Sequence, residues 1–577
     1  MYNKIPFIEV KKYKDDFWLG YEEILKKIDK EILSPRFNIV IDYYHGVDEE
    51  EIFENFIKYL PGNKISTERF KLKEKEILNK INDFLTEDRV FGYMCHYELI
   101  DFFDKSKIKE IKEKLSTKNE VNIIYGIGAS LFVENPDIII YLDMARWEIQ
   151  QRFRNKTLDN WGAKNFEEDV LKKYKRSFFI EWRVLDKHKK RLFDKIDYLI
   201  DTNLKNNPKM ISGKAFREGL ENAVKTPFRL VPFFDPGVWG GQWMKEVCNL
   251  DKNKKNYAWC FDCVPEENSL LLKGKNDIIV EIPSLDLVLY KPKELLGEQV
   301  YARFGAEFPI RFDFLDTIEG QNLSLQVHPI TDYIQEKFGM HYTQDESYYI
   351  LDAKEDACVY LGVKENINSD EFINDLKEAN KGIKIFDDSK YINKFPAKKH
   401  DHFLIPAGTV HCSGKNSMVL EISSTPYIFT FKLWDWERLG LDGLPRPIHI
   451  EHGEKVIQYD RDTNWVKNNL VNNIQTIHTE DGIIEERTGL HKLEFIETRR
   501  HWFSKPVLHK TNGNVNVLNL VEGEEAIIKS PTNKFLPYKV NYAETFIIPA
   551  NIDEYIIEPF GKSKGKTIGT IKAYVRF

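Results

Sequence analysis

The sequence has little of what marks secreted, membrane-spanning or nucleic-acid-binding proteins. Six cysteines among 577 residues are too few for a disulfide framework, which favours a reducing compartment. No uninterrupted apolar run approaches the ~18 residues of a membrane helix, and the start, MYNKIPFIEVKKYKDDFW, lacks the apolar core of a signal peptide. Positive charge is not in excess either, because 84 Lys and Arg face 91 Asp and Glu, a net charge of -7. We therefore predict a cytoplasmic protein without membrane or nucleic-acid partners.

What the sequence does contain is typical of a globular protein with several domains. Hydrophobic residues make up 42%, charged residues 30% and aromatic residues 13% of the chain, a balance that argues against disorder. At roughly 150 residues per domain, the length corresponds to three or four domains.

Residues 1–221 alternate between strand-like and helix-like segments. FNIVID (37–42), VNIIYGIGASLF (121–132) and DIIIYLDM (137–144) have the apolar runs of buried strands. Residues 67–85 and 166–196 carry apolar residues at helical spacing. This alternation predicts an α/β domain with a mostly parallel sheet.

After residue 222 the pattern changes to short strands separated by turn residues. These runs include NDIIVEIP, LDLVLY, PIRFDFLD, SYYILDA and SMVLEIS, with one helical interruption at 369–382. HFLIPAG (402–408) is echoed by TFIIPAN (545–551), which predicts two related β-barrels in tandem. We place these barrels at residues 222–455 and 456–577.

Four side chains with metal-binding chemistry lie between residues 324 and 411. Gln326 and His328 are two apart in the predicted strand LSLQVHP, so both point to the same face. Glu346 lies at the start of a further strand, and His411 follows a Pro-Ala-Gly turn that would aim it at the barrel mouth. Each residue alone has an ordinary structural explanation. Two imidazoles, one carboxylate and one amide oxygen together suit a metal ion such as zinc, so the joint pattern predicts a metal site.

The same motifs resemble those of type I mannose-6-phosphate isomerase. The resemblance rests on LSLQVHP, DESYYIL, FLIPAGTVH and FKLWDWERLGLDGLPRPIHIE, preceded by PGVWGG and FPIRFDFLDT, in the family's order across residues 222–577. It implies two cupin-like jelly-roll barrels, one catalytic zinc ion per chain, and interconversion of mannose 6-phosphate and fructose 6-phosphate. The implied zinc ligands are Gln326, His328, Glu346 and His411.

The resemblance also implies roles for residues that would contact the hexose phosphate. Ser324 falls on a position that contacts the substrate phosphate, and Trp239 would line the site. Lys432 falls where the family usually has a catalytic arginine, and Arg438 falls on a basic position near the phosphate. A packed aromatic in a Gly-flanked turn is an equal interpretation of Trp239.

Two departures from the family pattern concern the phosphate contacts more than the metal. The family often has a lysine two residues before the glutamate ligand, and this chain has Gln344. Lys432 keeps the positive charge of the usual arginine but loses its planar fork. The general base stays open, with a metal-bound water, a carboxylate or an imidazole as candidates.

The second barrel has Asn551 to Asp553 where the first has the residues leading to His411, and it has no counterpart of the Gln-x-His pair. We predict that this barrel binds no metal and packs against the first.

The N-terminal region resembles uridine-kinase-like P-loop enzymes, with Arg146, Arg152 and Arg154 as candidate phosphate-binding arginines. Its first loop, DYYHGVDEE (42–50), is acidic and lacks the lysine with which a phosphate loop holds a triphosphate. We predict a degenerate kinase-like domain that has lost ATP-dependent catalysis. An unrelated α/β packing domain, through which the chain would form a homo-oligomer, is the alternative.

Three functional hypotheses follow for the whole chain. The first is a zinc-dependent sugar-phosphate isomerase with an appended α/β domain. The second is a non-catalytic sugar-phosphate sensor or assembly protein built on the same barrel. The third, ranked last, is a bifunctional kinase–isomerase.

Overall fold

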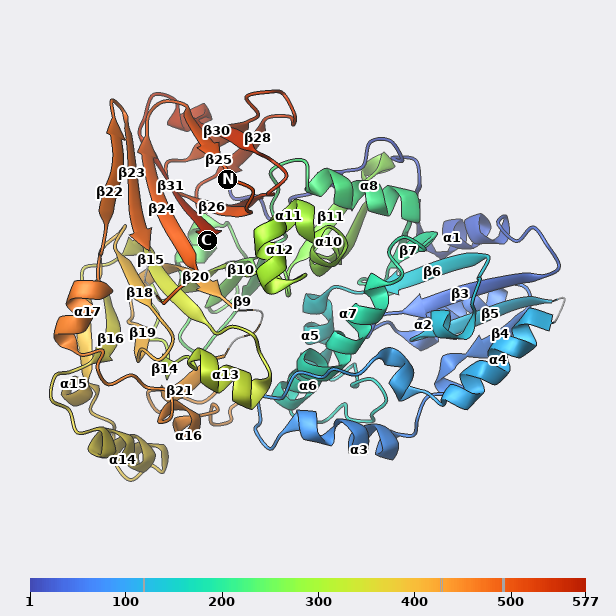
Figure 1. Ribbon diagram of the computed structural model, residues 1–577, viewed down its shortest axis with the longest axis horizontal. Helices are drawn as coiled ribbons and strands as arrows, with labels where there is room; N and C mark the ends of the chain where they lie inside the picture. Colours follow the sequence, from blue (N-terminus) through green and yellow to red (C-terminus); the bar gives the residue numbers. More distant parts are fainter. Residues whose placement is uncertain (118–119, 426, 428, 490–492) are drawn as a thin grey trace. The chain divides into compact units, whose positions relative to one another are not determined.

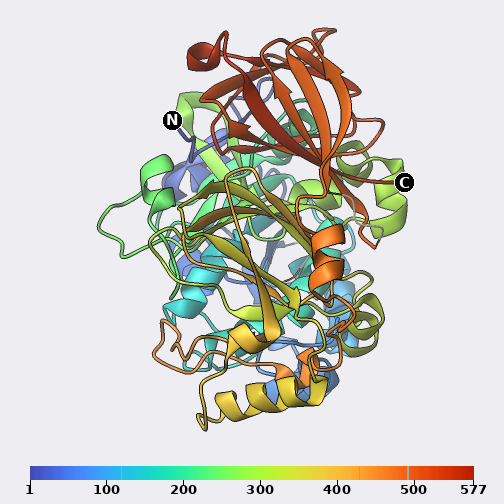
Figure 2. The same ribbon diagram turned by 90° about the vertical axis from the view of Figure 1, so that its left-hand side faces the viewer.

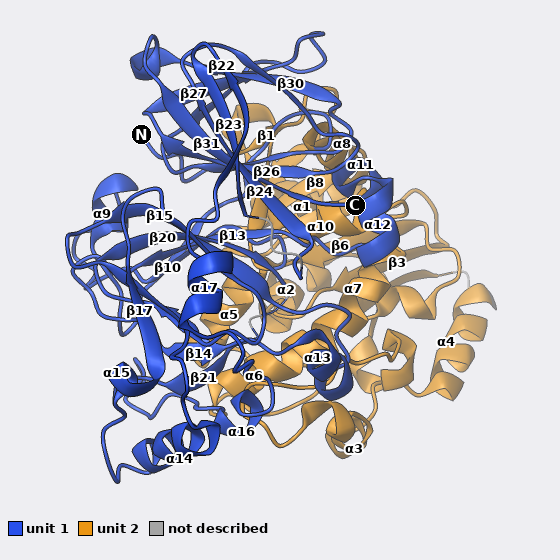
Figure 3. Cartoon of the chain, turned by 60° about the vertical axis from the view of Figure 1, so that its left-hand side comes forward, with its two compact units in different colours: residues 1–6, 224–266, 292–577 blue, residues 7–223, 267–291 orange. Residues whose placement is uncertain are grey.

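A computed structural model describes residues 1–577 apart from 118, 119, 426, 428 and 490–492. The chain forms two compact units (Figure 3): unit 1 contains residues 1–6, 224–266 and 292–577, and unit 2 contains residues 7–223 and 267–291. Over the part of the chain that the structure describes, no helix is both long and apolar enough to cross a bilayer. The predicted domain boundaries at 221/222 and 455/456 stay predictions.

Unit 2 is built on a seven-stranded mixed sheet with the order β2-β8-β7-β6-β3-β5-β4 (Figure 1). Five strands run parallel: β3 (Phe37–Tyr43), β4 (Asn63–Ser66), β5 (Val121–Gly126), β6 (Ile138–Asp143) and β7 (Tyr198–Asp201). β2 (Phe17–Leu19) and β8 (Lys209–Ser212) add an antiparallel edge. Every residue of β3 is buried, which is why this strand reads as a continuous apolar run.

Helices alternate with these strands, as the sequence predicts. They are α1 (Gly20–Asp29), α2 (Glu49–Asn55), α3 (Glu74–Leu85), α4 (Lys105–Thr117), α5 (Arg146–Arg154), α6 (Val170–Arg176), α7 (Trp182–Lys190) and α8 (Gly213–Ala223). A π-helical turn, Ser177–Glu181, joins α6 to α7. Because this turn packs five residues where an α-helix would place about four, it shifts the side chains of α7 around the helix axis.

Residues 267–291 belong to unit 2 although they follow the first strands of unit 1 in the sequence. They form β11 (Ser269–Lys273), β12 (Ile279–Pro283) and α10 (Leu285–Tyr290), and β11 pairs with β1 (Ile8–Glu9). The prediction of a strand for LDLVLY was wrong, since this segment is the helix α10. This segment of six residues is apolar at every position except Asp286, a pattern that fits a strand or a buried helix, and its length does not decide between them.

Unit 1 consists of two β-sandwiches of two sheets each, which we name the first and second sandwich. The first pairs the sheets β18-β15-β20-β13-β10-β9 and β17-β16-β19-β14-β21. Its strands are β9 (Phe233–Asp235), β10 (Trp259–Cys263), β13 (Arg311–Asp316), β14 (Leu325–Val327), β15 (Asp345–Ala353), β16 (Cys358–Val363), β17 (Ile392–Pro396), β18 (His402–Ile405), β19 (His411–Ser413), β20 (Ser417–Ser424) and β21 (Phe431–Trp434).

The second sandwich pairs the sheets β22-β23-β24-β31-β26-β29 and β25-β30-β27-β28. In Figure 2 its strands, coloured orange to red, curve around one another. They are β22 (Gln475–Glu480), β23 (Ile483–Gly489), β24 (Ile496–Phe503), β25 (Val507–Lys510), β26 (Asn516–Glu522), β27 (Glu525–Lys529), β28 (Tyr538–Asn541), β29 (Thr545–Ile548), β30 (Glu554–Pro559) and β31 (Ile568–Val575).

The two sandwiches share one strand order. The edge strand β18 carries HFLI and the edge strand β29 carries TFII, so the two echoed segments take the same place in their sheets. Next to them lie β15 and β26, then β20 and β31, and then β13 and β24. The smaller sheets match as well, with β14 in the place of β25 and β19 in the place of β30. This shared topology agrees with the predicted duplication.

Short helices connect the strands of unit 1. They are α9 (Trp243–Val247), α11 (Pro292–Leu296), α12 (Glu298–Phe304), α13 (Thr331–Phe338), α14 (Ser369–Asn380), α15 (Asp388–Tyr391), α16 (Ile450–Gly453) and α17 (Thr463–Asn469). The predicted helical interruption is confirmed as α14. The Asn368 side chain caps it by accepting a hydrogen bond from the Glu371 amide.

His402 on β18 makes the stability of the first sandwich depend on pH. The side chain is fully buried, and neither ring nitrogen has a hydrogen-bond partner within the described chain. Burial, assisted by nearby Arg500, lowers the pKa of His402 to about 3. The unfolded histidine titrates near 6.5, so the stability contribution is complete above that pH and declines as pH falls toward the folded pKa.

We therefore expect this group to cost about 2 kcal/mol of unfolding free energy between pH 6.5 and pH 5, at ~1.4 kcal/mol per pH unit. Urea unfolding at pH 7.5 and pH 5 should show a smaller pH dependence for His402→Phe than for the wild type. His478→Phe, at an exposed histidine on β22, is the matched control. Equal pH dependence of His402→Phe and the wild type would contradict the expectation.

Candidate metal centre

Three of the four predicted ligands converge inside the first sandwich. His328 follows β14, Glu346 lies on β15 of the opposite sheet, and His411 begins β19. Glu346 Oε2 lies 3.0 Å from His328 Nε2, and Glu346 Oε1 lies 2.8 Å from His411 Nε2. All three side chains are buried. Among the His, Cys, Asp and Glu side chains of the described residues, these three form a group whose ligand atoms are close enough to share a metal ion.

The backbone fixes which nitrogen each imidazole presents to Glu346. His328 Nδ1 lies 2.7 Å from the Phe429 carbonyl oxygen, and His411 Nδ1 lies 2.8 Å from the Thr409 carbonyl oxygen. A carbonyl only accepts, so both Nδ1 atoms carry the proton and both neutral rings turn an Nε2 lone pair toward the carboxylate. Lone pairs facing carboxylate oxygens at about 3 Å repel each other unless a cation or a proton lies between them. The donor set therefore fits a metal ion.

The charges of the cluster agree with that fit. Burial favours the neutral acid, yet positive charge on His328 and His411 holds the pKa of Glu346 well below its usual range. With both rings neutral, a bound metal ion would supply the positive charge that keeps the buried carboxylate ionised. A borderline ion with nitrogen and oxygen ligands, such as zinc, suits two imidazoles and one carboxylate.

Gln326, the fourth predicted ligand, lies beside this cluster. It is the cross-strand partner of His411, and its amide Nε2 lies 3.3 Å from His411 Nε2. A half-turn of the amide would present Oε1 to the same point. Lys432 on β21 is the cross-strand partner of Gln326 on the other side, so its side chain leaves the same face of the sheet.

The predicted phosphate-contact residues form a second cluster at Ser324, which lies just before the strand that carries Gln326. Ser324 Oγ donates to Asp435 Oδ1 at 2.6 Å, and Arg438 Nη2 donates to the same oxygen at 2.7 Å. Arg446 Nη1 contacts Ser324 Oγ at 3.1 Å and Asp435 Oδ1 at 2.9 Å. Ser324 and Gln326 are two residues apart, about 7 Å in an extended chain. We name Ser324, Asp435, Arg438 and Arg446 the arginine cluster; two guanidinium groups against one carboxylate leave it one positive charge.

Two further carboxyl groups face the metal cluster, and sequence reasoning missed them. Asp313 on β13 and Glu421 on β20 are direct cross-strand partners, and Glu421 is also the partner of Tyr348. Burial raises the pKa of Asp313 to about 7, with Arg311 opposing and Glu346 adding to the rise. Burial together with Asp313 and Glu346 raises the pKa of Glu421 well above its usual range. Their only sequence signal was an acidic residue among apolar ones in FDFLD and VLEIS, which many strands carry.

Arg446 and Asp435 were also missed, because a proline-flanked arginine and an Asp between tryptophans carry no motif of their own. Trp239 is buried and packs edge-on against Trp259, with ring centroids 4.6 Å apart. Its predicted contact with substrate stays a prediction.

In the second sandwich the ligand positions hold other side chains. Glu346 pairs with Ile405, and the equivalent Ile548 pairs with Asn516, so Asn516 takes the place of Glu346. Asn516 Oδ1 accepts a hydrogen bond from the Tyr555 hydroxyl at 2.9 Å. The carboxylate ligand is replaced here by an amide already bound within the chain. This favours the prediction that the second sandwich holds no metal.

The carboxyl edge of the parallel sheet in unit 2 is the place where doubly wound folds bind ligands. Asp42 at the end of β3 accepts hydrogen bonds from the Gly128 and Ser130 amides, both at 2.9 Å, and lies 2.9 Å from His188 Nε2. Gly126 and Gly128 have φ of +116° and +75°, and this loop turns its amides toward one point. The chain's own carboxylate thus binds the amides that would otherwise be available to a phosphate.

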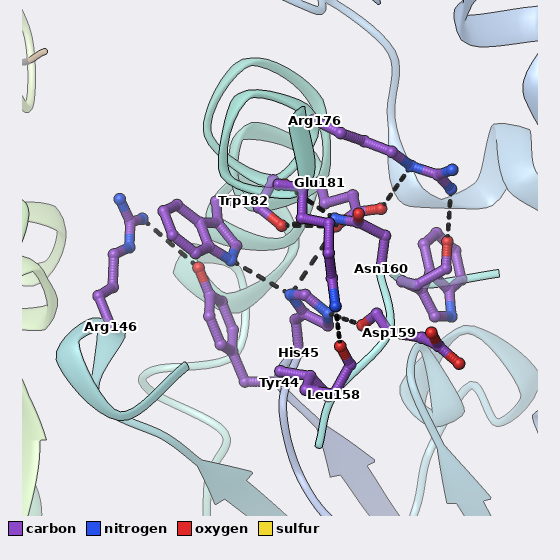
Figure 4. Close-up of polar contacts among 12 residues, drawn as sticks. Tyr44, His45, Arg146, Leu158, Asp159, Asn160, Arg176, Glu181 and Trp182 are labelled. Atoms are coloured by element: carbon purple, nitrogen blue, oxygen red, sulfur yellow. Dashed lines mark hydrogen bonds and ion pairs between the residues drawn. The ribbon is translucent and has the colours of Figure 1, made fainter. Parts of the chain in front are cut away.

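The loop after β3 is held by a buried polar network (Figure 4). Trp182 Nε1 can only donate, so His45 Nδ1, at 3.3 Å, is the acceptor, and His45 Nε2 donates to the Asp159 carbonyl at 3.0 Å. Glu181 joins Arg176 at 2.8 Å and accepts from Asn160 at 2.9 Å. These bonds satisfy the loop without a ligand.

The arginines predicted for phosphate binding are engaged within unit 2. Arg146 is buried, and its Nη2 donates to Asp186 Oδ2 at 2.5 Å. Arg152 pairs with Glu148 at 2.9 Å and donates to the Gly46 carbonyl at 2.9 Å. Arg154 lies over the Trp147 ring, 5.3 Å from its centroid. The edge of this sheet is therefore filled by the chain's own side chains.

The structure thus shows a buried His–Glu–His cluster that could hold a metal ion. Comparison with known proteins finds relatives of this chain. It is 25% identical over 342 residues to the probable mannose-6-phosphate isomerase GmuF of Bacillus subtilis, an alignment that spans 58% of this chain and 96% of that protein. It is 22% identical over 339 residues to the mannose-6-phosphate isomerase ManA of the same organism, spanning 58% of this chain and 97% of the relative.

Among solved structures, the mannose 6-phosphate isomerase from Bacillus subtilis aligns with a TM-score of 0.48 and 18% identity, covering 61% of this chain and 100% of the other. A family model described as "Domain of unknown function (DUF8485)" matches residues 20–225, all but two of which lie within unit 2.

Proposed function

We propose that this chain is a metal-dependent aldose–ketose isomerase that interconverts mannose 6-phosphate and fructose 6-phosphate, with one zinc ion per chain. The observation that carries the proposal is the closeness of two sites along one segment of the chain, at β14 and just before it. An imidazole–carboxylate cluster suited to a metal lies beside Gln326, and a positively charged cluster lies about 7 Å away at Ser324. The names of the curated relatives, matched over nearly their whole length, agree with this chemistry. The two sandwiches correspond in this proposal to the cupin-like barrels that the sequence predicts.

The reaction needs no oxidant or reductant. The C2–H bond of the aldose breaks and a C1–H bond forms, while the hydroxyl proton leaves O2 and a proton arrives on O1. A zinc ion, when bound, supplies a Lewis acid that polarises the carbonyl oxygen.

His328, Glu346, His411 and Gln326 would hold the ion. Lys432, on the same sheet face as Gln326, would stabilise the negative charge that develops on the sugar oxygens.

The arginine cluster would bind the phosphate group. Ser324 Oγ, Arg438 Nη2 and Arg446 Nη1 meet at one carboxylate oxygen of Asp435, which shows that three donors can converge on one anionic atom. A phosphate arriving here would share these donors with Asp435. Asp313 and Glu421 face the metal cluster, and in this proposal one of these carboxyl groups would carry the proton between C2 and C1.

The test is turnover of mannose 6-phosphate by protein of measured zinc content. We expect conversion to fructose 6-phosphate that disappears on chelation and returns when zinc is added back. Zinc bound at one ion per chain without turnover of this or another aldose phosphate would refute the isomerase and leave the metal site standing.

A non-catalytic sugar-phosphate sensor is the second candidate. It is favoured by the engagement of Ser324, Arg438 and Arg446 with Asp435, and by the amide at Gln344 where the resembled family often has a lysine. Hexose phosphate binding without turnover would support the sensor, and turnover that His411→Ala abolishes would exclude it.

For unit 2 we propose no nucleotide-dependent activity, because its own side chains fill the ligand edge of the sheet. Binding of ATP in titration calorimetry would support the hypothesis of a bifunctional kinase–isomerase. An oligomer formed through this unit stays a prediction.

A further inference from the structure

Gln344 stands two residues before Glu346 and is almost completely buried, at 4% exposure. Its amide nitrogen donates to Glu346 Oε2 at 3.0 Å. Its amide oxygen accepts a hydrogen bond from the Phe429 backbone amide, also at 3.0 Å. Both polar atoms of the side chain are therefore used, one of them on a candidate metal ligand.

Phe429 connects this side chain to a second ligand. The backbone amide of Phe429 binds Gln344, while its carbonyl oxygen accepts from His328 Nδ1 at 2.7 Å. His328 Nε2 in turn lies 3.0 Å from Glu346 Oε2. The contacts close into a ring through Gln344, Glu346, His328 and Phe429. Rotation of the carboxylate or of the imidazole would break a hydrogen bond elsewhere in the ring.

We propose that Gln344 is a positioning residue that orients Glu346 toward the metal, in fixed relation to His328, without adding charge to the centre. Outer contacts of this kind set the orientation and basicity of metal ligands. A neutral amide leaves the carboxylate available to the ion. An ammonium group at this place could donate to the carboxylate but could not accept from the Phe429 amide, so it would leave the ring open. This inference rests on the metal centre of the proposed function, though not on the identity of its substrate.

The experiment compares zinc affinity and cobalt(II) spectra of the full-length wild type with Gln344→Met and Gln344→Lys. Competition against a chromophoric chelator measures zinc affinity, and the visible absorption of cobalt(II) reports ligand geometry without any turnover. We expect both variants to bind zinc about 10–100-fold more weakly. We also expect an altered cobalt(II) spectrum, with the larger change for Gln344→Met because it loses both hydrogen bonds.

Gln150→Met is the matched control. Gln150 is a buried glutamine of unit 2 whose amide also donates to a carboxylate, that of Glu267. It should leave both readouts unchanged. Lysine is the residue that the resembled family often carries at the place of Gln344, so Gln344→Lys is the variant expected to fold if Gln344→Met does not.

Zinc affinity and a cobalt(II) spectrum equal to those of the wild type in a folded Gln344 variant would overturn the inference. Weakened metal binding in the Gln344 variants, together with a wild type that shows no turnover, would instead overturn the proposed isomerase and still support the role of Gln344.

Discussion

Glu346→Gln is expected to remove both metal binding and isomerase turnover. Glu346 is the one anionic member of the predicted ligand set and bridges both imidazoles, at 3.0 Å to His328 and 2.8 Å to His411. An amide of the same shape keeps the packing but loses the negative charge that attracts the ion. Changes to residues that only orient ligands typically cost roughly 10–100-fold in affinity, so we expect a loss above about 100-fold here.

Two measurements check this expectation. Zinc added in excess should raise the unfolding temperature of the wild type, since a ligand that binds the folded state stabilises it, and should leave that of Glu346→Gln unchanged. Mannose 6-phosphate turnover should fall to background in the same variant. Glu336→Gln, on the exposed side of α13, serves as control. A variant that keeps zinc affinity and turnover would show that the metal, if bound, lies elsewhere.

Lys189→Met is expected to destabilise unit 2 by about 3–5 kcal/mol. The Lys189 ammonium group contacts Asp143 at the end of β6 and lies 2.5 Å from Asp286 of α10. All three side chains are at least 98% buried. Burial opposes the charge of Lys189, but the two carboxylates raise its pKa above the usual range. Without the lysine, two carboxyl groups would face each other in an apolar setting, where both cannot ionise.

Urea unfolding followed by circular dichroism measures this cost. Lys190→Met, at the exposed neighbouring residue, should change the unfolding free energy by less than about 0.5 kcal/mol. The double variant Lys189→Met with Asp286→Asn should recover part of the loss, because it removes one of the two opposed carboxylates. An unfolding curve for Lys189→Met that coincides with that of Lys190→Met would contradict the buried ion triad.

These two substitutions act on different links between sequence and function. Glu346 is a candidate ligand, predicted from its residue type and its place at the start of an aromatic strand. Lys189 is one of four consecutive basic residues in Lys-His-Lys-Lys (187–190), and nothing in that run distinguishes the buried lysine from its exposed neighbour. The π-helical turn before α7 and the arrival of α10 from residues 267–291 decide which lysine is buried.

The sequence by itself determined the strands and helices with clear periodicity and the joint metal pattern. β3, β5, β6 and α14 follow from apolar runs or helical spacing, and Gln326, His328, Glu346 and His411 follow from residue types that suit one ion. The echo between residues 402–408 and 545–551 predicted a duplication, and the shared strand order of the two sandwiches agrees with it. These features are local or repeated, so they can be predicted from the order of residues in the sequence.

Only the tertiary structure decided which distant residues meet. Asp313 and Glu421 are ordinary strand residues until the register of β13 and β20 sets them opposite each other beside Glu346. Arg446 contacts Ser324 across 122 residues of sequence. Residues 267–291 belong to unit 2, where Asp286 pairs with Lys189 and β11 pairs with β1. Such pairings are set by strand register and by the burial of charge, and one-dimensional periodicity carries no information on either.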